Sequence, residues 1–170
     1  MEEQILFSER QKFNQWWLWV LIIVFNIIFL SQIFGLLNNE RTASGKPTNT
    51  TMILICVGVN AIVFMLFIFS RLVTQIRPDG IYVKFFPFHL SFKHYPWETI
   101  SKAYIRTYSP ISEYGGWGLR YGIFGAGKAF NVSGDQGLQL EFLNHKKLLI
   151  GTQKPEELEN ALIKAGKVTA

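Results

Sequence analysis

The residues best suited to bind a partner are gathered in a glycine-rich segment, residues 115–128 of the 170-residue chain. Three glycines surround Trp117, so the backbone can turn sharply there and leave the indole little local cover. An aromatic ring near the planar guanidinium of Arg120 is typical of surfaces that grip a protein or a phosphate group. The structural alternative has Trp117 filling the mouth of a small β core and Arg120 paired with Glu98 or Asp135. The candidate binding residues are Trp117, Arg120, Tyr121 and Lys128.

The same segment nearly matches a nucleotide-binding loop. Residues 122–129, GIFGAGKA, fit the pattern G-x-x-x-x-G-K-[ST] except at Ala129, which replaces the hydroxyl that would hold Mg²⁺. The residues that follow have the pattern of a strand, whereas a phosphate loop needs a helix at that point. We therefore interpret the segment as a hairpin loop.

Other chemical signals are weak. His89, His94 and His145 have no acidic or cysteine neighbours at the spacing of metal ligands, and the single cysteine, Cys56, lies in an apolar run. No serine-nucleophile motif of the form G-x-S-x-G is present. We expect no metal, no cofactor and no enzymatic activity. A small membrane enzyme, which would need a cleft with converging acids or a metal, is the alternative of another class.

Two apolar runs dominate the first half of the chain. Residues 52–69 carry no charge, and eighteen helical residues extend about 27 Å, close to the hydrocarbon thickness of a bilayer. The run at 16–37 opens with three tryptophans suited to the headgroup level, Trp16, Trp17 and Trp19. A cleaved signal peptide is the alternative for this run, but the start of the chain is acidic and the run is long.

These runs predict an α+β membrane protein with two transmembrane helices. The expected segments are an N-terminal surface segment at 1–15, helices at 16–37 and 51–73, an extracytoplasmic loop at 38–50 and a cytoplasmic domain at 74–168. Asn26 and Asn60 lie at similar depth in the two helices, so they could bond each other. Alternatively, each bonds its own helix backbone or a helix of another protein.

The last hundred residues predict a strand-rich basic domain. Period-two patterns indicate strands at 81–86, 103–108, 129–132, 138–142 and 148–150, with turns at 77–80, 134–137 and 144–147. A helix is expected from Pro155 to Gly166, with an apolar stripe. Residues 71–170 hold thirteen basic and eight acidic side chains, a balance that suits anionic headgroups or an acidic protein better than nucleic acid. Phe88 and Phe92 belong to an aromatic stretch that forms either core or an anchor at the membrane interface.

Four motifs in this domain resemble those of a known family: YPWE-x-I at 95–100, GGWG-x-R at 115–120, NVSG at 131–134 and IGT-x-x-P-x-x-L at 150–158. Over residues 70–165 the chain resembles bacterial membrane-anchored proteins with a pleckstrin-homology-like domain. The resemblance implies a curved antiparallel sheet or barrel of seven strands, capped by one C-terminal helix. It implies binding of lipids or proteins, and it does not imply an activity.

The sequence therefore predicts a non-enzymatic scaffold or accessory subunit in the bacterial inner membrane. Both termini are expected in the cytoplasm, because basic residues are more frequent on that side of the helices. The expected partners are membrane lipids and another membrane protein or a second copy of the chain. The alternative within the same class is recognition of anionic lipid headgroups by the basic domain.

Overall fold

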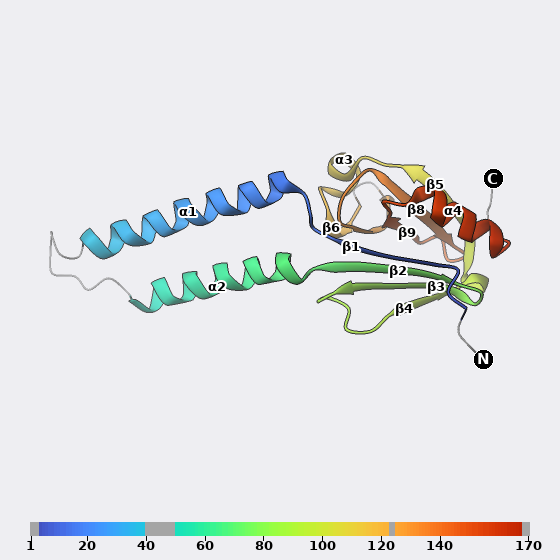
Figure 1. Ribbon diagram of the computed structural model, residues 1–170, viewed down its shortest axis with the longest axis horizontal. Coiled ribbons are helices and arrows are strands. Elements are labelled where there is room, and N and C mark those ends of the chain that lie inside the picture. The colour runs from blue at the N-terminus through green and yellow to red at the C-terminus, as the bar shows by residue number, and fades with distance from the viewer. Residues whose placement is uncertain (1–3, 40–49, 123–124, 168–170) are drawn as a thin grey trace. The chain divides into compact units, whose positions relative to one another are not determined.

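The computed structural model describes residues 4–39, 50–122 and 125–167. The chain divides into two units (Figure 1). Asn14–Phe69 form one unit, called the helical unit below, and Met1–Phe13 together with Ser70–Ala170 form the other, called the β domain. The β domain is therefore discontinuous in sequence and wider than the predicted span of 74–168.

The helical unit consists of α1 (Trp16–Asn39) and α2 (Thr50–Phe69). The helices run antiparallel, because Trp19 near the start of α1 meets Phe64 near the end of α2, with ring centroids 6.2 Å apart. Among the described residues one helical stretch, Trp16–Gly35, is long and apolar enough to cross a membrane or to act as a signal sequence. The apolar stretch of α2, Ile53–Phe69, is shorter.

The second helix ends earlier than the predicted 51–73. After Phe69 the chain enters β2 (Arg71–Arg77), where Leu72, Thr74 and Ile76 are buried and their neighbours are half-buried. Burial with a period of two is the pattern of a strand that has one face on a core. Most of the predicted loop at 38–50, residues 40–49, lies outside the described residues.

The prediction of a surface segment at 1–15 is wrong for Phe7–Lys12, which form strand β1. β1 pairs antiparallel with β2, and its last residue, Lys12, lies opposite Arg71, the first residue of β2. The alternating burial of β1 places Phe7, Glu9 and Gln11 inside the β domain. Two of these three side chains are polar, which is why the segment does not read as a strand.

Both buried polar side chains of β1 have partners near the start of the C-terminal helix. The Glu9 carboxylate accepts a hydrogen bond from the Thr152 hydroxyl at 2.7 Å and one from the Gln153 backbone N–H at 2.9 Å. The Gln11 side-chain amide donates to the carbonyl oxygen of Gly151 at 2.7 Å. These bonds tie the N-terminal strand to a segment about 140 residues further along the chain.

The first sheet has the strand order β1-β2-β3-β4 and is antiparallel throughout. β3 (Gly80–Phe86) follows the predicted turn at 77–80, and β4 (Lys93–Pro96) leads into the short helix η1 (Trp97–Thr99). Phe86, at the end of β3, lies opposite Arg71, whereas Gly80 lies opposite Arg77. The two ends of this sheet are thereby defined by Arg71 and Arg77.

The second sheet has the order β5-β8-β9-β7-β6. Its strands are β5 (Ile100–Thr107), β6 (Gly118–Tyr121), β7 (Lys128–Asn131), β8 (Gln136–Phe142) and β9 (Lys147–Gly151), and α3 (Pro110–Tyr114) follows β5. The predicted strands are confirmed. The prediction of a wholly antiparallel sheet is wrong for one pair, because β7 and β9 are parallel. Residues 134–137 therefore belong to a crossover connection between β7 and β8 rather than to a hairpin turn, since β9 lies between these two strands in the sheet.

The C-terminal helix α4 (Pro155–Lys164) is confirmed and completes the core. Its predicted stripe buries Leu158, Ala161 and Leu162. The helix packs against β1, β2, β5 and β8, so it touches both sheets. Within the described residues, nine strands in two sheets and one capping helix make this an α+β domain, and the predicted count of seven strands is too low.

Candidate binding groove

A groove of about 680 Å³ lies on the β domain between three segments. Strand β4 forms one wall, and the β6–β7 and β8–β9 hairpins form the others. The hydrogen-bonding side chains along it include His94, Tyr121, Lys128, His145, Lys146 and Lys147. The groove therefore brings together lysines from two hairpins and a histidine from β4.

Aromatic side chains support the β4 wall. The ring of Tyr95 packs on Phe142 with centroids 5.5 Å apart, and His94 stacks on Tyr82 at 4.3 Å. Burial raises the pKa of the Tyr95 hydroxyl, so this residue stays neutral and adds no negative charge to the groove.

The positive charge of the groove is only partly neutralised. Lys147 Nζ lies 3.7 Å from the Glu141 carboxylate. Lys128 Nζ sits 5.1 Å from the centroid of the Tyr121 ring, a cation–π arrangement. Among the described residues neither Lys128 nor Lys146 forms an ion pair. A concave surface with unpaired lysines attracts anionic groups.

The glycines predicted to form a hairpin loop do so, and they shape the groove. The backbone N–H of Gly122 donates to the carbonyl oxygen of Gly127 at 2.6 Å, which closes the β6–β7 hairpin. Gly127 has φ of 83°, and a Cβ there would overlap the carbonyl oxygen of Lys147. Only glycine lets the hairpin approach β9 so closely. A strand follows this loop rather than a helix, so it lacks the helix that a phosphate loop requires.

The four predicted binding residues are divided by the fold. Tyr121, with 69% of its surface exposed, and Lys128 line the groove. Trp117 is half-buried, and its indole N–H donates to the carbonyl oxygen of Gly134 at 3.1 Å. Arg120 is exposed and donates to the carbonyl oxygen of Trp117 at 3.0 Å, and it forms no ion pair with an acid in the described part of the chain. Arg120 and Tyr121 are consecutive in β6, so their side chains point to opposite faces of the strand.

Sequence reasoning missed the contributions of β4 and the β8–β9 hairpin. His94 and His145 were considered only as possible metal ligands, and residues 144–147 were interpreted only as a turn. The consecutive cations of the 144–147 turn were a signal, but their position beside the β6–β7 hairpin depends on the parallel pairing of β7 and β9.

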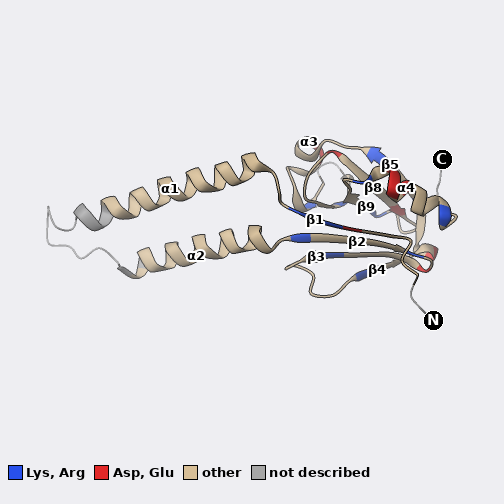
Figure 2. Ribbon diagram, in the orientation of Figure 1, with Lys and Arg blue, Asp and Glu red and all other residues tan. Residues whose placement is uncertain are grey.

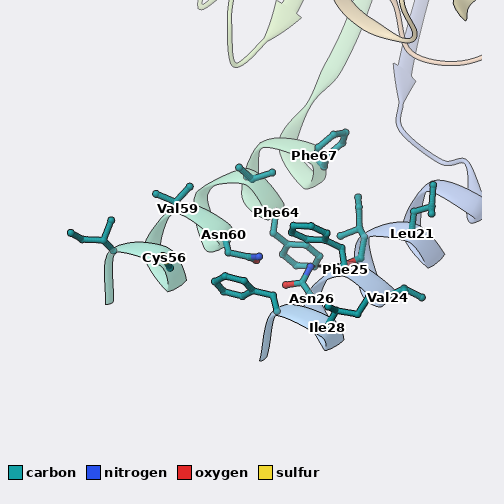
Figure 3. A pocket seen from close by; sticks show the side chains of 14 residues that line it. Leu21, Val24, Phe25, Asn26, Ile28, Cys56, Val59, Asn60, Phe64 and Phe67 are labelled. Atoms are coloured by element: carbon teal, nitrogen blue, oxygen red, sulfur yellow. Dashed lines mark hydrogen bonds between the residues drawn. The ribbon is translucent and has the colours of Figure 1, made fainter. Parts of the chain in front are cut away.

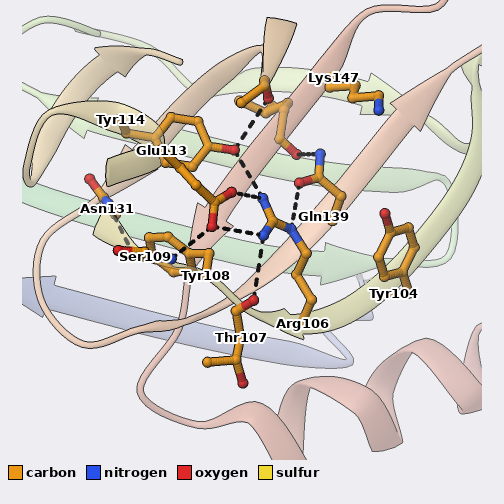
Figure 4. Close-up of polar contacts among 12 residues, drawn as sticks. Tyr104, Arg106, Thr107, Tyr108, Ser109, Glu113, Tyr114, Asn131, Gln139 and Lys147 are labelled. Atoms are coloured by element: carbon orange, nitrogen blue, oxygen red, sulfur yellow. Dashed lines mark hydrogen bonds and ion pairs between the residues drawn. The ribbon is translucent and has the colours of Figure 1, made fainter. Parts of the chain in front are cut away.

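A second polar cluster surrounds Arg106 and is internally satisfied (Figure 4). The guanidinium donates to both carboxylate oxygens of Glu113, at 3.2 and 2.7 Å, and to the side-chain oxygen of Gln139 at 3.0 Å. It also donates to the hydroxyl of Tyr114 at 3.2 Å. The hydrogen bonds that Arg106 donates to Glu113 lower the pKa of the Glu113 carboxyl and raise the pKa of the Arg106 guanidinium. With its donors occupied, the cluster stabilises the fold and leaves no cation free for a ligand.

The helical unit contains the polar pair that the sequence singled out. Asn26 and Asn60 line one pocket between α1 and α2 (Figure 3). The Asn26 side-chain amide donates to the carbonyl oxygen of Ile22 in its own helix at 2.7 Å. Asn26 thus bonds the backbone of its own helix, which was the alternative to a bond between the two asparagines. Among the described residues no hydrogen bond joins Asn26 and Asn60.

The predicted interface residues are accessible to different degrees. Trp16 is 77% exposed at the start of α1, Trp17 is also exposed, and Trp19 is half-buried against Phe64. Phe88 and Phe92 are both exposed, in the loop between β3 and β4. Phe85, from the same aromatic stretch, is buried in the core.

These features define a two-part α+β protein, in which an apolar helical unit interrupts a β domain that carries a basic groove. In the part of the chain that the structure describes, no group of three or more His, Cys, Asp or Glu residues could hold a metal ion. The chain belongs to the family of unknown function DUF6141, whose model matches residues 2–168. No curated protein and no solved structure matches the chain.

Proposed function

We propose that this chain is a membrane-anchored binding module without enzymatic activity, acting as a scaffold or accessory subunit. The helical unit would cross the membrane twice, and the β domain would present its groove to an acidic segment of a protein partner. The observation that carries the proposal is the pairing of β1 with β2 across the helical unit, with Lys12 opposite Arg71. The residues just before and just after the helices thus belong to one sheet.

This pairing supports two crossings rather than one. Two adjacent strands of one sheet must lie on the same side of a membrane. If α1 crosses, the chain has to return through α2 before it reaches Arg71. The twenty residues of α2 extend about 30 Å, enough for the return.

The same pairing argues against cleavage of α1 as a signal peptide. Removal of α1 would also remove β1, which precedes it. The β domain would lose the buried side chains of Phe7, Glu9 and Gln11, together with the hydrogen bonds that two of them make. An uncleaved anchor keeps this strand in place.

The charge distribution favours the cytoplasm as the side of the membrane on which the β domain lies. Arg10 and Lys12 precede α1, and Arg71 and Arg77 follow α2, which agrees with the positive-inside rule. We place the protein in the inner membrane of a bacterium, with both termini inside. We also propose a pleckstrin-homology-like fold for the β domain, supported by the two sheets and the capping helix; the parallel pair β7 and β9 departs from that pattern.

The position of the groove favours a protein as its ligand rather than the lipid headgroups of the membrane in which the helices lie. Its β4 wall includes His94, which lies opposite Tyr82, and Tyr82 lies opposite Gln75. Gln75 is four residues beyond Arg71, so this wall begins about 14 Å from the end of the sheet that is joined to the helices. Recognition of anionic lipid headgroups by the groove is the second candidate, favoured by the unpaired Lys128 and Lys146.

Copurification tests the function. The full chain is extracted from native membranes in mild detergent, and bound proteins and lipids are identified by mass spectrometry. The test variant is Lys128→Gln with Lys146→Gln, and the control is Lys102→Gln with Lys164→Gln, which removes the same charge outside the groove. We expect a stoichiometric protein partner that the test variant loses and the control keeps. Bound phospholipid alone would favour the lipid candidate, and turnover of a substrate would refute both.

A labelling experiment tests the two crossings separately. In a Cys56→Ser background, Ser44→Cys should react with an impermeant thiol reagent in whole cells, whereas the exposed position of Ser112→Cys should react only after lysis. Labelling at 112 and not at 44 would reverse the orientation. Labelling of both positions in intact cells would contradict the double crossing.

A further inference from the structure

The loop between β3 and β4, residues 87–92, exposes three large apolar side chains. Phe88 is 58% exposed, Leu90 79% and Phe92 38%. Single exposed apolar residues are common on proteins, but three within five residues form a patch, which marks an interaction surface. Leu90 is the most exposed of the three and was not singled out in the sequence.

The loop is held by a residue that turns inward. The backbone N–H of His89 donates to the carbonyl oxygen of Phe85 at 2.8 Å, and His89 Nδ1 accepts from the Phe85 N–H at 3.3 Å. The imidazole meets the buried ring of Phe130 edge-on, with centroids 5.2 Å apart. Because His89 is fixed to the core, its neighbours Phe88 and Leu90 are left on the solvent side.

Strand register gives the position of the loop within the first sheet. The loop starts after Phe86, which lies opposite Arg71, and Arg71 lies opposite Lys12. One residue separates Arg71 from the end of α2 at Phe69. The loop therefore lies at the end of the sheet where the chain leaves the β domain and returns to it (Figure 1).

Basic residues accompany the patch. Lys12, Arg71, Lys84 and Lys93 belong to the strands of this sheet, whose lysines and arginines are blue in Figure 2. Lys84 Nζ lies 5.9 Å from the ring centroid of Phe92. The one acid between residues 70 and 97 is Asp79, in the turn at the opposite end of the sheet. Apolar side chains bordered by cations suit the boundary of an anionic bilayer, because lysine and arginine reach the headgroups while the apolar groups enter the acyl region.

We propose that the 87–92 loop is a second membrane contact, which inserts Phe88, Leu90 and Phe92 into the interface of an anionic bilayer. This inference rests on the proposed function, because the helices must span the membrane to bring this end of the sheet to its surface. This contact would determine which end of the first sheet faces the lipid. The Arg71 end would face the bilayer, and the Arg77 end would point to the aqueous phase. A protein covering the patch is the competing occupant.

Lipid-borne quenching tests the contact in the full chain. The protein, in a Cys56→Ser background, is reconstituted in vesicles of phosphatidylcholine and phosphatidylglycerol, and a fluorophore is attached to one cysteine at a time. Leu90→Cys reports on the loop, and Ile28→Cys reports on the middle of α1. Glu98→Cys, an exposed position beyond the far end of β4, is the control. With a nitroxide-labelled lipid we expect quenching at 90 about fivefold greater than at 98.

The three positions separate failure of this inference from failure of the proposed function. Absence of quenching at 28 would show that the helices do not span, and both proposals would fall. Quenching at 28 with equal signals at 90 and 98 would overturn the loop contact alone. Shielding of position 90 from a soluble quencher in native membranes, without quenching by the labelled lipid in vesicles, would assign the patch to a protein and overturn it as well.

A second comparison tests the basic residues. Lys84→Gln with Lys93→Gln should reduce the quenching at position 90 roughly fivefold in vesicles with phosphatidylglycerol. In pure phosphatidylcholine the same change should have little effect. Lys102→Gln with Lys164→Gln is the control for net charge. An equal reduction by both pairs would contradict a local role for Lys84 and Lys93.

Discussion

Replacement of Glu9 by alanine should unfold the β domain at a much lower temperature. The Glu9 carboxylate is buried and accepts two hydrogen bonds, from the Thr152 hydroxyl at 2.7 Å and from the Gln153 N–H at 2.9 Å. A hydrogen bond to a charged group contributes about 1.5–3 kcal/mol, and its loss here leaves buried donors without an acceptor. We therefore expect Glu9→Ala to lower the free energy of unfolding by roughly 3–5 kcal/mol.

For a domain of this size such a loss lowers the melting temperature by about 10–20 °C. The assay is thermal unfolding of the full chain in detergent, followed by near-ultraviolet circular dichroism. Ser8→Ala, an exposed neighbour on the same strand, is the control and should change the stability by less than about 0.5 kcal/mol.

A double-mutant cycle with Thr152→Ala identifies the cause. The two side chains share one hydrogen bond, so the double variant should be more stable than the sum of the single effects predicts, by about 1 kcal/mol or more. If Glu9→Ala melts within about 2 °C of Ser8→Ala, β1 does not hold the domain together as the structure indicates.

Two further predictions concern the groove and the Arg106 cluster. Gly127→Ala should destabilise the β domain by roughly 3 kcal/mol or more, because its Cβ would overlap the Lys147 carbonyl oxygen. The control Gly134→Ala, at a position with similar φ and open space, should cost only about 1–2 kcal/mol. Equal losses of stability in thermal melts of the two variants would contradict the close approach of the hairpin to β9. Arg106 lowers the pKa of Glu113 from its ordinary value of 4.5, so this pair stabilises the fold above pH 4.5 and ceases to do so as the pH falls through the lower folded-state pKa. Melting of an Arg106→Gln variant should be less sensitive to pH over that acidic range than melting of the parent, and an unchanged sensitivity would refute the role of the pair.

Five strands and the last helix could be predicted because their local patterns agree with their burial; the strands are β3, β5, β7, β8 and β9. Ile81, Val83 and Phe85 alternate in the sequence and are all buried in β3. Leu158 and Leu162 recur at helical spacing and both face the core. Where alternation or helical spacing of apolar residues decides which face is buried, the sequence alone suffices.

Strand β1 could not be predicted, because its inward face carries Glu9 and Gln11. Buried polar side chains look like surface residues until their partners are known, and here the partners are at Gly151, Thr152 and Gln153. The parallel pairing of β7 and β9 was missed for a related reason. Each strand was recognised, but their neighbours in the sheet depend on contacts between distant parts of the chain.

The candidate site was predicted in part. Tyr121 and Lys128 were found from local composition, and both line the groove. Trp117 and Arg120 came from the same segment, but neither of them lines the groove. Lys146 was missed because it reaches the groove from another hairpin, and no property of its immediate sequence signals that neighbour.

The split of the β domain has a consequence for synthesis of the chain. β1 leaves the ribosome before α1, but its partner β2 appears only after α2 has been made. With the two crossings that we propose, the domain becomes complete only when both helices have been inserted. A chain that failed to insert α2 would leave β1 and β2 on opposite sides of the membrane, with Phe7 and the buried face of β2 exposed. Folding of this domain would thus proofread membrane insertion, and misinserted chains would remain unfolded substrates for proteolysis.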